Sequence, residues 1–582
     1  MEEVCQYCSK MLFMDWSEDL SVEHYATVSE FIQRANGCIM CQFVLRRLAL
    51  QDAHDRFADL SEAYYSSMNV HIYFCGQPVL QKYVIWILAA ADFIIPEHDF
   101  AFRSKFLLSK CRRAGPVRLI YTSSLEGQVV RYATLSHCWG EQLPLRTTAD
   151  NEASFEEEIP NEIIPKTFQD AIEISRRLGI NYLWLDALCI QQDDPVEWRQ
   201  EAAIMKDVYA RSVLTIAAAS ARNSHDGCFP LMNESVPVDL TQFEIKSPNS
   251  DSGSLLVRAH RGDTQFATEN APLSTRGWVL QEQILSKRII YCMSPEFHWQ
   301  CQCLYETESG VAFTRQERKF LPALIEGPAA DQDDIWYRLM DDYSTRRFTY
   351  PRDRLAALVG IVEQFSIVSG DRHILACWER SLARGLLWLP LEPEQTPNPD
   401  PFPGIPSWSW LSRFESIQVG PWRSGIGKAR LEYHTKLLDW DVSWAGTPLL
   451  SNIILAVLFL EGPIQVITLS VASEARAFNP TYLNVGDELP NFDKSSIPWH
   501  CAGRFDHNSN PPKSDYACLL VQSRIRDNDI SARDWCHETF LMLELVAPDD
   551  PSTNIYRRIG IANFRGVESQ FNQNDIRQIR LV

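Results

Sequence analysis

The chain has 582 residues but no hydrophobic run long enough to cross a lipid bilayer. The best candidate, 452–469, is interrupted by Glu461, Gly462 and Pro463, so we expect two buried strands around a turn there. The opening residues, MEEVCQYCSK, are acidic and polar and lack the features of a secretory signal. We therefore expect a cytoplasmic protein without a membrane span.

Basic residues are fewer than acidic ones. The sequence has 55 lysines and arginines and 75 aspartates and glutamates, which gives a net charge of -20. An acidic surface disfavours non-specific binding to nucleic acid, so we expect no nucleic-acid partner. The sequence also lacks the glycine-rich GxGxxG and Walker loops, which disfavours a Rossmann dehydrogenase or a P-loop nucleotidase. With 45% hydrophobic and 22% charged residues, the composition is that of a globular protein of several domains.

Cysteine, by contrast, is plentiful, with 16 residues and no secretory signal to favour disulfides. Cys5 and Cys8 form one C-x-x-C pair, and Cys38 and Cys41 form a second, separated from the first by 29 residues. Two such pairs can supply four thiolates to a tetrahedral zinc ion, and His24 could replace one of them. The pattern predicts a structural zinc site, with free buried thiols as the alternative.

Composition divides the chain into six segments. They are a cysteine-paired N-terminal segment (1–50), a mixed α/β segment (51–130), an α/β segment (131–303) with a polar insertion at about 223–271, a mostly helical segment (304–389), a proline-rich connector (390–406) and a strand-rich C-terminal region (407–582). Proline-rich stretches of this kind are typical of domain boundaries.

The segment 131–303 alternates short apolar runs with amphipathic helices. We expect strands at 132–137, 182–185, 213–219 and 289–292, with helices between them. Thr167 and Asp170 have the spacing of a capping box, and Asp194 before Pro195 marks a second helix start. Buried strands joined by helices predict the α/β class, with a doubly wound parallel sheet covered on both faces.

Polar residues follow these strands at their carboxyl ends, where ligands of doubly wound sheets bind. The residues are Ser136, His137, Cys138, Asp186, Cys189 and Ser220. We therefore expect the functional site at this edge of the sheet.

Five blocks of this segment resemble, in the same order, the blocks of the fungal heterokaryon-incompatibility (HET) domain. They are YATLSHCWG (132–140), IPKTFQDAI (164–172), YLWLDALCIQQDD (182–194), WRQEAAIMKDVY (198–209) and STRGWVLQE (274–282). The resemblance implies an effector of non-self recognition that leads to programmed cell death. It also implies self-association or a protein partner.

HET domains are similar to TIR domains, which share a doubly wound parallel sheet, and some TIR domains cleave NAD with a helical glutamate. By this resemblance Glu282, on the same helical face as Trp278, is the candidate catalytic residue. Trp278 joins Ser136, His137 and Asp186 as candidate nucleotide-binding residues, with NAD as substrate rather than cofactor. The insertion before Trp278 departs from the compact TIR pattern.

A carboxylate can stabilise the oxocarbenium-like state of nicotinamide–ribose cleavage. Glu282 could instead cap the helix or form an ion pair.

Two other functions stay open at this point. The domain could be a non-enzymatic scaffold that acts by self-association or partner binding, with Trp278 and Glu282 serving the fold. It could also be a hydrolase in which Cys189 is the nucleophile and His137 the base, because both residues follow strands at the same sheet edge.

Overall fold

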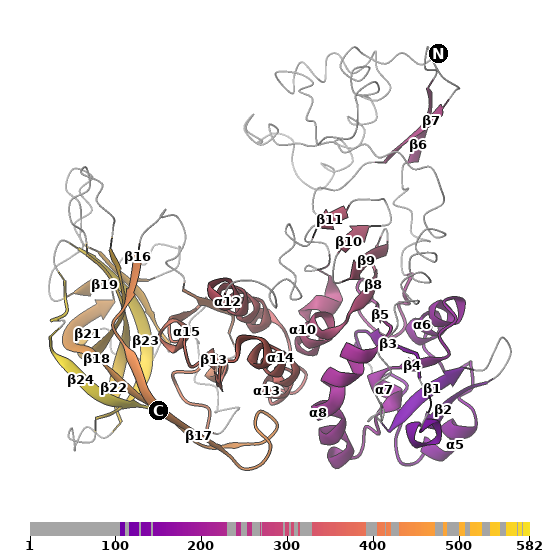
Figure 1. Cartoon of the computed structure of the whole chain (residues 1–582), viewed down its shortest axis with the longest axis horizontal. Helices are drawn as coiled ribbons and strands as arrows, with labels where there is room; N and C mark the ends of the chain where they lie inside the picture. Colours follow the sequence, from indigo (N-terminus) through magenta and orange to yellow (C-terminus); the bar gives the residue numbers. More distant parts are fainter. Residues whose placement is uncertain are drawn as a thin grey trace.

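The fold is described from a computed structural model. It describes residues 105–110, 116–126, 128, 130–140, 144–229, 240–245, 253–258, 268, 271–294, 297–301, 304–307, 312–314, 329–391, 404–413, 415–420, 430–471, 481–485, 500–506, 513–525, 536–546, 554–566, 569–572 and 574–582. The expected zinc ligands lie outside the described residues: Cys5, Cys8, Cys38, Cys41 and the substitute His24. Figure 1 shows the described elements in three adjoining parts, which we call the α/β part, the middle helices and the C-terminal sheet.

A nine-stranded sheet forms the centre of the α/β part, with the strand order β11-β10-β9-β8-β5-β3-β4-β1-β2. Its four inner strands are parallel: β3 (Tyr132–Ser136), β4 (Tyr182–Trp184), β5 (Leu214–Ala217) and β8 (Arg288–Cys292). The chain runs from β3 to β4 on one side and then returns to β5 on the other, which makes the parallel core doubly wound. The predicted parallel sheet is thus confirmed for these four strands.

The whole sheet is mixed, because further strands extend the predicted parallel core at both edges. Antiparallel strands extend both edges: β1 (Phe106–Lys110) and β2 (Val117–Tyr121) beyond β4, and β9 (Phe297–Cys301), β10 (Leu304–Thr307) and β11 (Ala312–Thr314) beyond β8. The insertion also contains an antiparallel pair, β6 (Leu240–Ile245) and β7 (Gly253–Arg258). Strands of three to six residues carry too little periodicity to be told from loops by sequence.

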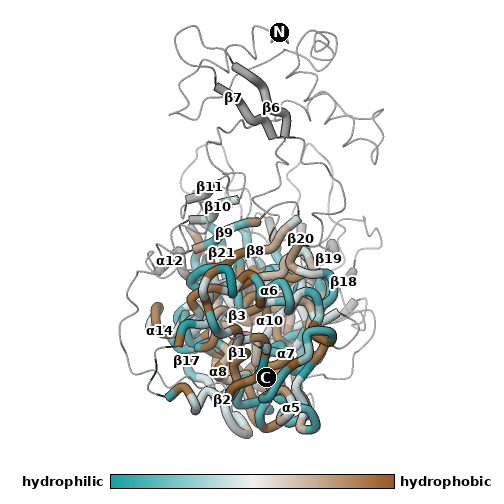
Figure 2. The backbone as a smooth tube through the Cα atoms, turned by 90° about the vertical axis from the view of Figure 1, so that its right-hand side faces the viewer, coloured by the Kyte–Doolittle hydropathy of each residue, from teal (hydrophilic) through white to brown (hydrophobic). Residues whose placement is uncertain are grey.

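Helices cover both faces of this sheet, as Figure 1 shows. On one face lie α5 (Glu152–Glu157) and α6 (Lys166–Arg177); on the other lie α8 (Pro195–Arg211) and α10 (Gly277–Leu285); and α7 (Asp186–Cys189) is one turn after β4. Figure 2 shows hydrophobic stretches gathered in the interior, where Phe168, Leu183 and Ile216 are fully buried. None of the helices among the described residues is long and apolar enough to span a membrane.

The two predicted helix starts had different outcomes. Asp194 caps α8 as predicted, because its carboxylate accepts a hydrogen bond from the Val196 amide at 2.7 Å. The capping box was wrong, because α6 already begins at Lys166 and places Thr167 inside the helix. Thr167 and Asp170 instead accept hydrogen bonds from the backbone amides of Gly227 and Cys228, and so fix the segment after β5.

The middle helices are α12 (Ala329–Thr345), α13 (Asp353–Ala356), α14 (Val359–Ser369) and α15 (Leu382–Gly385). Two short strand pairs accompany them, β12 (His373–Ile374) with β13 (Cys377–Trp378) and β14 (Trp388–Pro390) with β15 (Ile417–Val419). Trp336 and Trp378 pack edge-on at 4.9 Å in their shared core. The segment expected to be helical from 304 therefore begins with strands of the α/β sheet and becomes helical from 329.

The C-terminal region is strand-rich, as predicted. Its nine strands are β16 (Arg430–Tyr433), β17 (Lys436–Trp444), β18 (Ile453–Val471), β19 (Thr481–Val485), β20 (His500–Phe505), β21 (Lys513–Ile525), β22 (Cys536–Leu545), β23 (Ile555–Gly566) and β24 (Ile576–Leu581). The pairings close the sheet on itself, because β18 pairs with both β19 and β21.

The expected turn at Gly462 and Pro463 was wrong, because β18 continues through it as one strand. The strand changes partner there, pairing with β24 as far as Pro463 and with β21 from Ile464 onward. Proline has no N–H to donate, so it is tolerated where the ladder changes partner. The interruption in the apolar run therefore marks a change of partner and not a turn.

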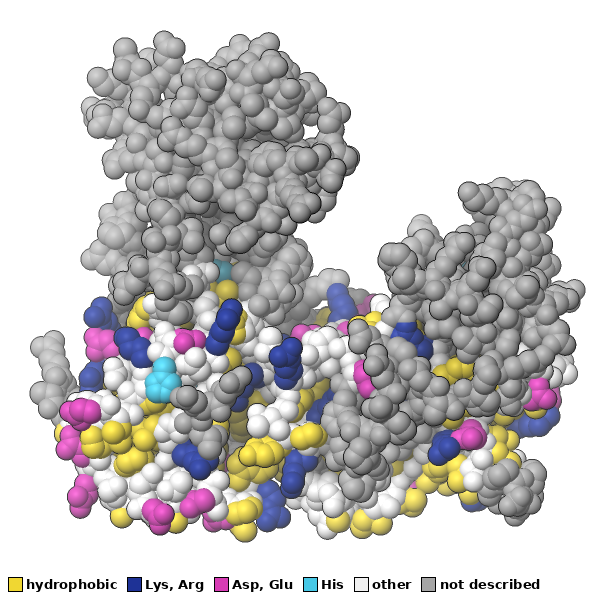
Figure 3. All heavy atoms as spheres, turned by 180° about the vertical axis from the view of Figure 1, so that it is seen from behind, with side chains coloured by type: hydrophobic (Ala, Val, Ile, Leu, Met, Phe, Trp, Pro, Cys, Tyr) yellow, Lys and Arg dark blue, Asp and Glu magenta, His cyan; other side chains and the backbone are white. Residues whose placement is uncertain are grey.

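Charged side chains of both signs are interspersed over the described part of the face in Figure 3. On the part of this face that the structure describes, the acidic excess is therefore not gathered into one field.

Candidate functional site

The carboxyl edge of the parallel strands brings polar side chains together from separate elements. Ser136 ends β3, His137 follows it, Asp186 begins α7 after β4, and Glu282 lies on α10. Ser136, His137 and Glu282 are only 2%, 2% and 4% exposed. With Arg276, described below, we call these residues the edge cluster. They lie where the strand order reverses beside β3, the usual ligand-binding position of a doubly wound sheet.

Burial strongly perturbs Glu282 in the edge cluster. Burial raises the pKa of Glu282 to about 7, against the opposing influence of Ser136 and Arg276. Ser136 is near enough to lower this pKa, yet neither Ser136 Oγ nor Glu282 Oε2 makes a hydrogen bond of regular geometry within the described residues. A buried carboxyl group with a pKa near 7 can exchange a proton at neutral pH, as a general acid or base must.

His137 is held as a neutral imidazole. Burial lowers the pKa of His137 to about 4, and Asp186 only partly offsets this. The Nδ1 atom lies 3.8 Å from Asp186 Oδ1, and the ring packs edge-on against Phe168 at 4.9 Å. Its Nε2 atom has no partner in the described part of the chain. His137 therefore presents an unused ring nitrogen without adding positive charge to the cluster.

Asp186 is fixed in place by its neighbours. Trp139 Nε1 donates a hydrogen bond to Asp186 Oδ2 at 2.9 Å, and the Ala187 amide donates to Oδ1 at 2.8 Å. Asp186 is the first residue of α7, and its carboxylate faces His137. Its two hydrogen bonds hold the carboxylate at the edge of the sheet.

Arg276 belongs to the cluster but was not singled out from the sequence. It lies directly before α10 and donates a hydrogen bond from Nη1 to the His137 carbonyl. Its positive charge lowers the pKa of both Glu282 and His137. The signal in the sequence was a cation six residues before the candidate glutamate, inside the same block.

Trp278, an expected nucleotide-binding residue, has its described contacts with α13 and α8. Its indole Nε1 donates to Asp353 Oδ2 on α13 at 3.2 Å, and its ring packs edge-on against Trp198 at 6.2 Å. Trp278 therefore joins the α/β part to the middle helices. The four-residue spacing of Trp278 and Glu282 predicts that they lie near one helical face. It does not predict the hydrogen bond from Trp278 to Asp353 on α13.

Cys189 is buried in an apolar setting. Its thiol donates a weak hydrogen bond to the Leu183 carbonyl at 3.8 Å, and burial raises the pKa of the thiol to about 12. Within the described residues, no hydrogen bond joins Cys189 to His137. Because the thiolate is the nucleophilic form, these surroundings disfavour the Cys189–His137 pair of a hydrolase.

The start of α10 is anchored to the middle helices through the backbone. The Gly277 amide donates to the Arg347 carbonyl at 2.9 Å, and the Arg347 amide donates to the Thr275 carbonyl at 2.7 Å. We call these two hydrogen bonds the α10 bridge. At Gly277 an added Cβ atom would lie 1.8 Å from Phe348 Cζ, so only glycine permits this approach. Arg276 and Glu282 are thus positioned partly from outside the α/β part.

These features define a protein with a doubly wound α/β domain and a buried acid–base cluster at its ligand-binding edge. Residues 132–282 match the family model described as Heterokaryon incompatibility protein (HET), from the first residue of β3 to Glu282 on α10. This segment of the chain is therefore similar to the HET domain, and the match relates it to heterokaryon incompatibility. No curated protein and no solved structure matches the chain.

Proposed function

We propose that the HET domain of this chain cleaves the nicotinamide–ribose bond of NAD or a related nucleotide, and that this activity drives programmed cell death in fungal non-self recognition. The supporting observation is Glu282, a buried carboxyl group with a pKa of about 7 at the edge of the parallel sheet. Ser136, His137 and Arg276 provide a hydroxyl, a neutral imidazole and a cation around the same edge.

The proposed reaction breaks the bond between ribose C1′ and the nicotinamide nitrogen. The bonding electron pair leaves with nicotinamide, and water adds to C1′ and releases a proton. The ionised Glu282 carboxylate stabilises the positive charge that develops on the ribose. Arg276 can neutralise a phosphate of the substrate, and the unpartnered Nε2 of His137 can bond a ribose hydroxyl.

The test compares NAD consumption by the purified full chain and by Glu282→Gln, at high protein concentration to permit self-association. We expect turnover by the wild type and a loss of about 100-fold or more in the variant, since the stabilising charge is removed. Glu201→Gln is the matched control, because Glu201 is also 4% exposed but bonds the Lys105 amide beside β1. Equal turnover by the wild type and Glu282→Gln, or none by either, would contradict the proposal.

A second candidate function is a non-enzymatic scaffold that acts by self-association or partner binding. Its supporting observation is that the edge cluster is closed, with Glu282 only 4% exposed, while α10 is engaged by α13 through Trp278. Expression in a fungal host separates the two functions. Growth arrest that survives Glu282→Gln without loss of cellular NAD favours the scaffold, whereas arrest that disappears together with NAD loss favours the enzyme.

A further inference from the structure

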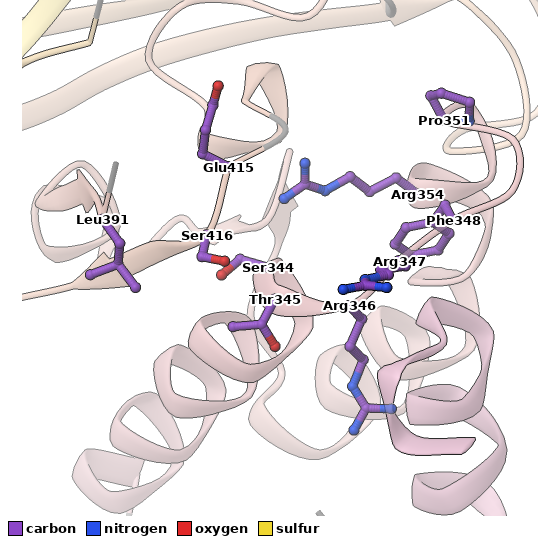
Figure 4. A pocket seen from close by; sticks show the side chains of 10 residues that line it. All are labelled: Ser344, Thr345, Arg346, Arg347, Phe348, Pro351, Arg354, Leu391, Glu415 and Ser416. Carbon is purple, nitrogen blue, oxygen red and sulfur yellow. The ribbon is translucent and has the colours of Figure 1, made fainter. Parts of the chain in front are cut away.

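A second site lies far from the edge cluster in the sequence, where the middle helices meet the segment before β15. It is a pocket of about 620 Å³. Its lining residues are Ser344, Thr345, Arg346, Arg347, Phe348, Pro351, Arg354, Leu391, Glu415 and Ser416 (Figure 4). Three of these ten residues are arginines, and none lies within the segment matched to the HET family.

Arg354 is the central feature of this pocket. It is only 4% exposed, donates from Nη1 to the Arg413 carbonyl, and packs against the Trp410 ring at 5.1 Å. Its Nε and Nη2 atoms have no hydrogen-bond partner in the described part of the chain. Figure 4 shows its guanidinium extending from α13 into the pocket toward Glu415 and Ser416. A buried cation with two unused donors is unfavourable unless an anion binds it.

The other charged residues leave the pocket positive. Glu415 is engaged by Arg413, whose Nε lies 3.4 Å from Glu415 Oε2, and Arg346 is paired with Asp342 at 2.8 Å. Arg347 lines the pocket with an exposed side chain, and no carboxylate partner is described for it. Burial lowers the pKa of Arg354 only to about 10, so its guanidinium stays charged at neutral pH. Arg347 and Arg354 thus supply two cations to one cavity.

We propose that this pocket binds a phosphate-bearing small molecule, with its phosphate on Arg354 and Arg347 and its body against Phe348, Pro351 and Leu391. The planar guanidinium offers paired donors that fit a phosphate. A cavity of about 620 Å³ is in the range that holds a small molecule and not only an ion. This site is independent of nucleotide cleavage at Glu282.

Calorimetric titration of the full chain tests the proposal, with sodium pyrophosphate as the probe and sodium malonate, at equal ionic strength, as the carboxylate comparison. We expect the wild type to bind pyrophosphate and Arg347→Met to weaken binding about tenfold or more, because a charge-assisted contact is lost. Arg354→Met should abolish binding. Arg338→Met should bind as the wild type does, because Arg338 is exposed on α12 and its side chain bonds the Asp334 carbonyl.

Because Arg354 also packs on Trp410, the Arg354→Met variant can be less stable than the wild type. The decisive variant is therefore Arg347→Met, because the Arg347 side chain is exposed. Absence of pyrophosphate binding by the wild type would overturn the proposal, as would equal binding by Arg347→Met. Binding of malonate without pyrophosphate would overturn the phosphate assignment. Glu282→Gln should bind pyrophosphate as the wild type does, which separates this site from the edge cluster whatever the outcome of the NAD assay.

Discussion

At the scale of single residues, burial acts on Glu282 and His137 in opposite directions. Loss of water disfavours the charged form of each group, so it raises the pKa of the carboxyl to about 7 and lowers that of the imidazole to about 4. Near neutral pH, proton exchange in this pair is therefore confined to Glu282.

The pH dependence of NAD cleavage follows from this on the proposed mechanism. Because the stabilising form of Glu282 is the carboxylate, kcat/KM for NAD should rise between pH 6 and pH 8, with a half-maximal value near the Glu282 pKa of about 7. Initial rates of nicotinamide release across this range provide the measurement. A rate that falls as the pH rises would mean that the protonated acid, and not the carboxylate, is the active form.

Stability should depend on pH through the same carboxyl group. Its pKa in the folded state, about 7, lies above the ordinary value of 4.5, so the folded state binds more protons between these two pH values. The contribution of Glu282 to stability is therefore fully present below pH 4.5 and is lost as the pH rises through 7. Relative to the wild type, Glu282→Gln should gain on the order of 3 kcal/mol over this window. Thermal midpoints of both proteins from pH 4.5 to pH 8 measure it, and a constant offset would contradict the raised pKa.

At the scale of elements, α10 shows what local sequence patterns can and cannot predict. The pattern predicted the four parallel strands and the helix itself, because buried runs and 3.6-residue periodicity are local signals. It placed Ser136, His137 and Asp186 at one edge, since the carboxyl ends of parallel strands meet there, whereas Glu282 was singled out by the family resemblance. It missed Arg276 and the contact of Trp278 with α13, because Arg276 bonds a carbonyl 139 residues away and Trp278 bonds Asp353, 75 residues away.

Close packing of α8, α10 and α14 should be sensitive to a single methyl group. An added Cβ at Gly360 on α14 would lie 2.6 Å from Lys206 Cβ and 2.7 Å from Gln281 Oε1, which already accepts the Gly360 amide hydrogen bond. Gly360→Ala should lower the free energy of unfolding by about 1–3 kcal/mol, measured by thermal denaturation. Gly446→Ala is the control, because its Cβ would approach only Ser451, at 3.3 Å. Equal stability of the two variants would mean that the helices separate easily.

At the scale of the whole molecule, buried arginines join the middle helices to the C-terminal sheet. Arg558 on β23 donates to the carbonyls of Leu386 and Trp388 at 2.8 and 2.5 Å and pairs with Asp506 at 3.1 Å. Arg504 on β20 donates to the Pro390 carbonyl at 2.7 Å. Pro390 is the first residue of the proline-rich connector, so the Arg504 contact reaches the start of that connector. The composition of the connector indicated a boundary, but contacts across more than 100 residues leave no local signal in the sequence.

Removing Arg558 should loosen this junction. Arg558→Met leaves Asp506 buried without its cation and frees two backbone carbonyls, which should destabilise the fold by about 3–5 kcal/mol. Limited proteolysis and thermal denaturation of the full chain measure the loss. Arg557→Met is the matched control, because the adjacent Arg557–Glu544 pair is exposed and contributes about 1 kcal/mol or less. Similar losses for both variants would show that the buried pair does not hold the two parts together.

The α10 bridge has a consequence for how two ligands would influence one another. The same short backbone contact ties Arg347, in the proposed anion pocket, to the residues that begin the helix of Arg276 and Glu282. If a ligand in the pocket shifts α10, it changes the affinity of the edge cluster for a nucleotide by some factor. A bound nucleotide must then change the affinity of the pocket for its ligand by the same factor, because coupling between two binding equilibria is reciprocal. The response of the chain to one metabolite would then depend on the concentration of the other.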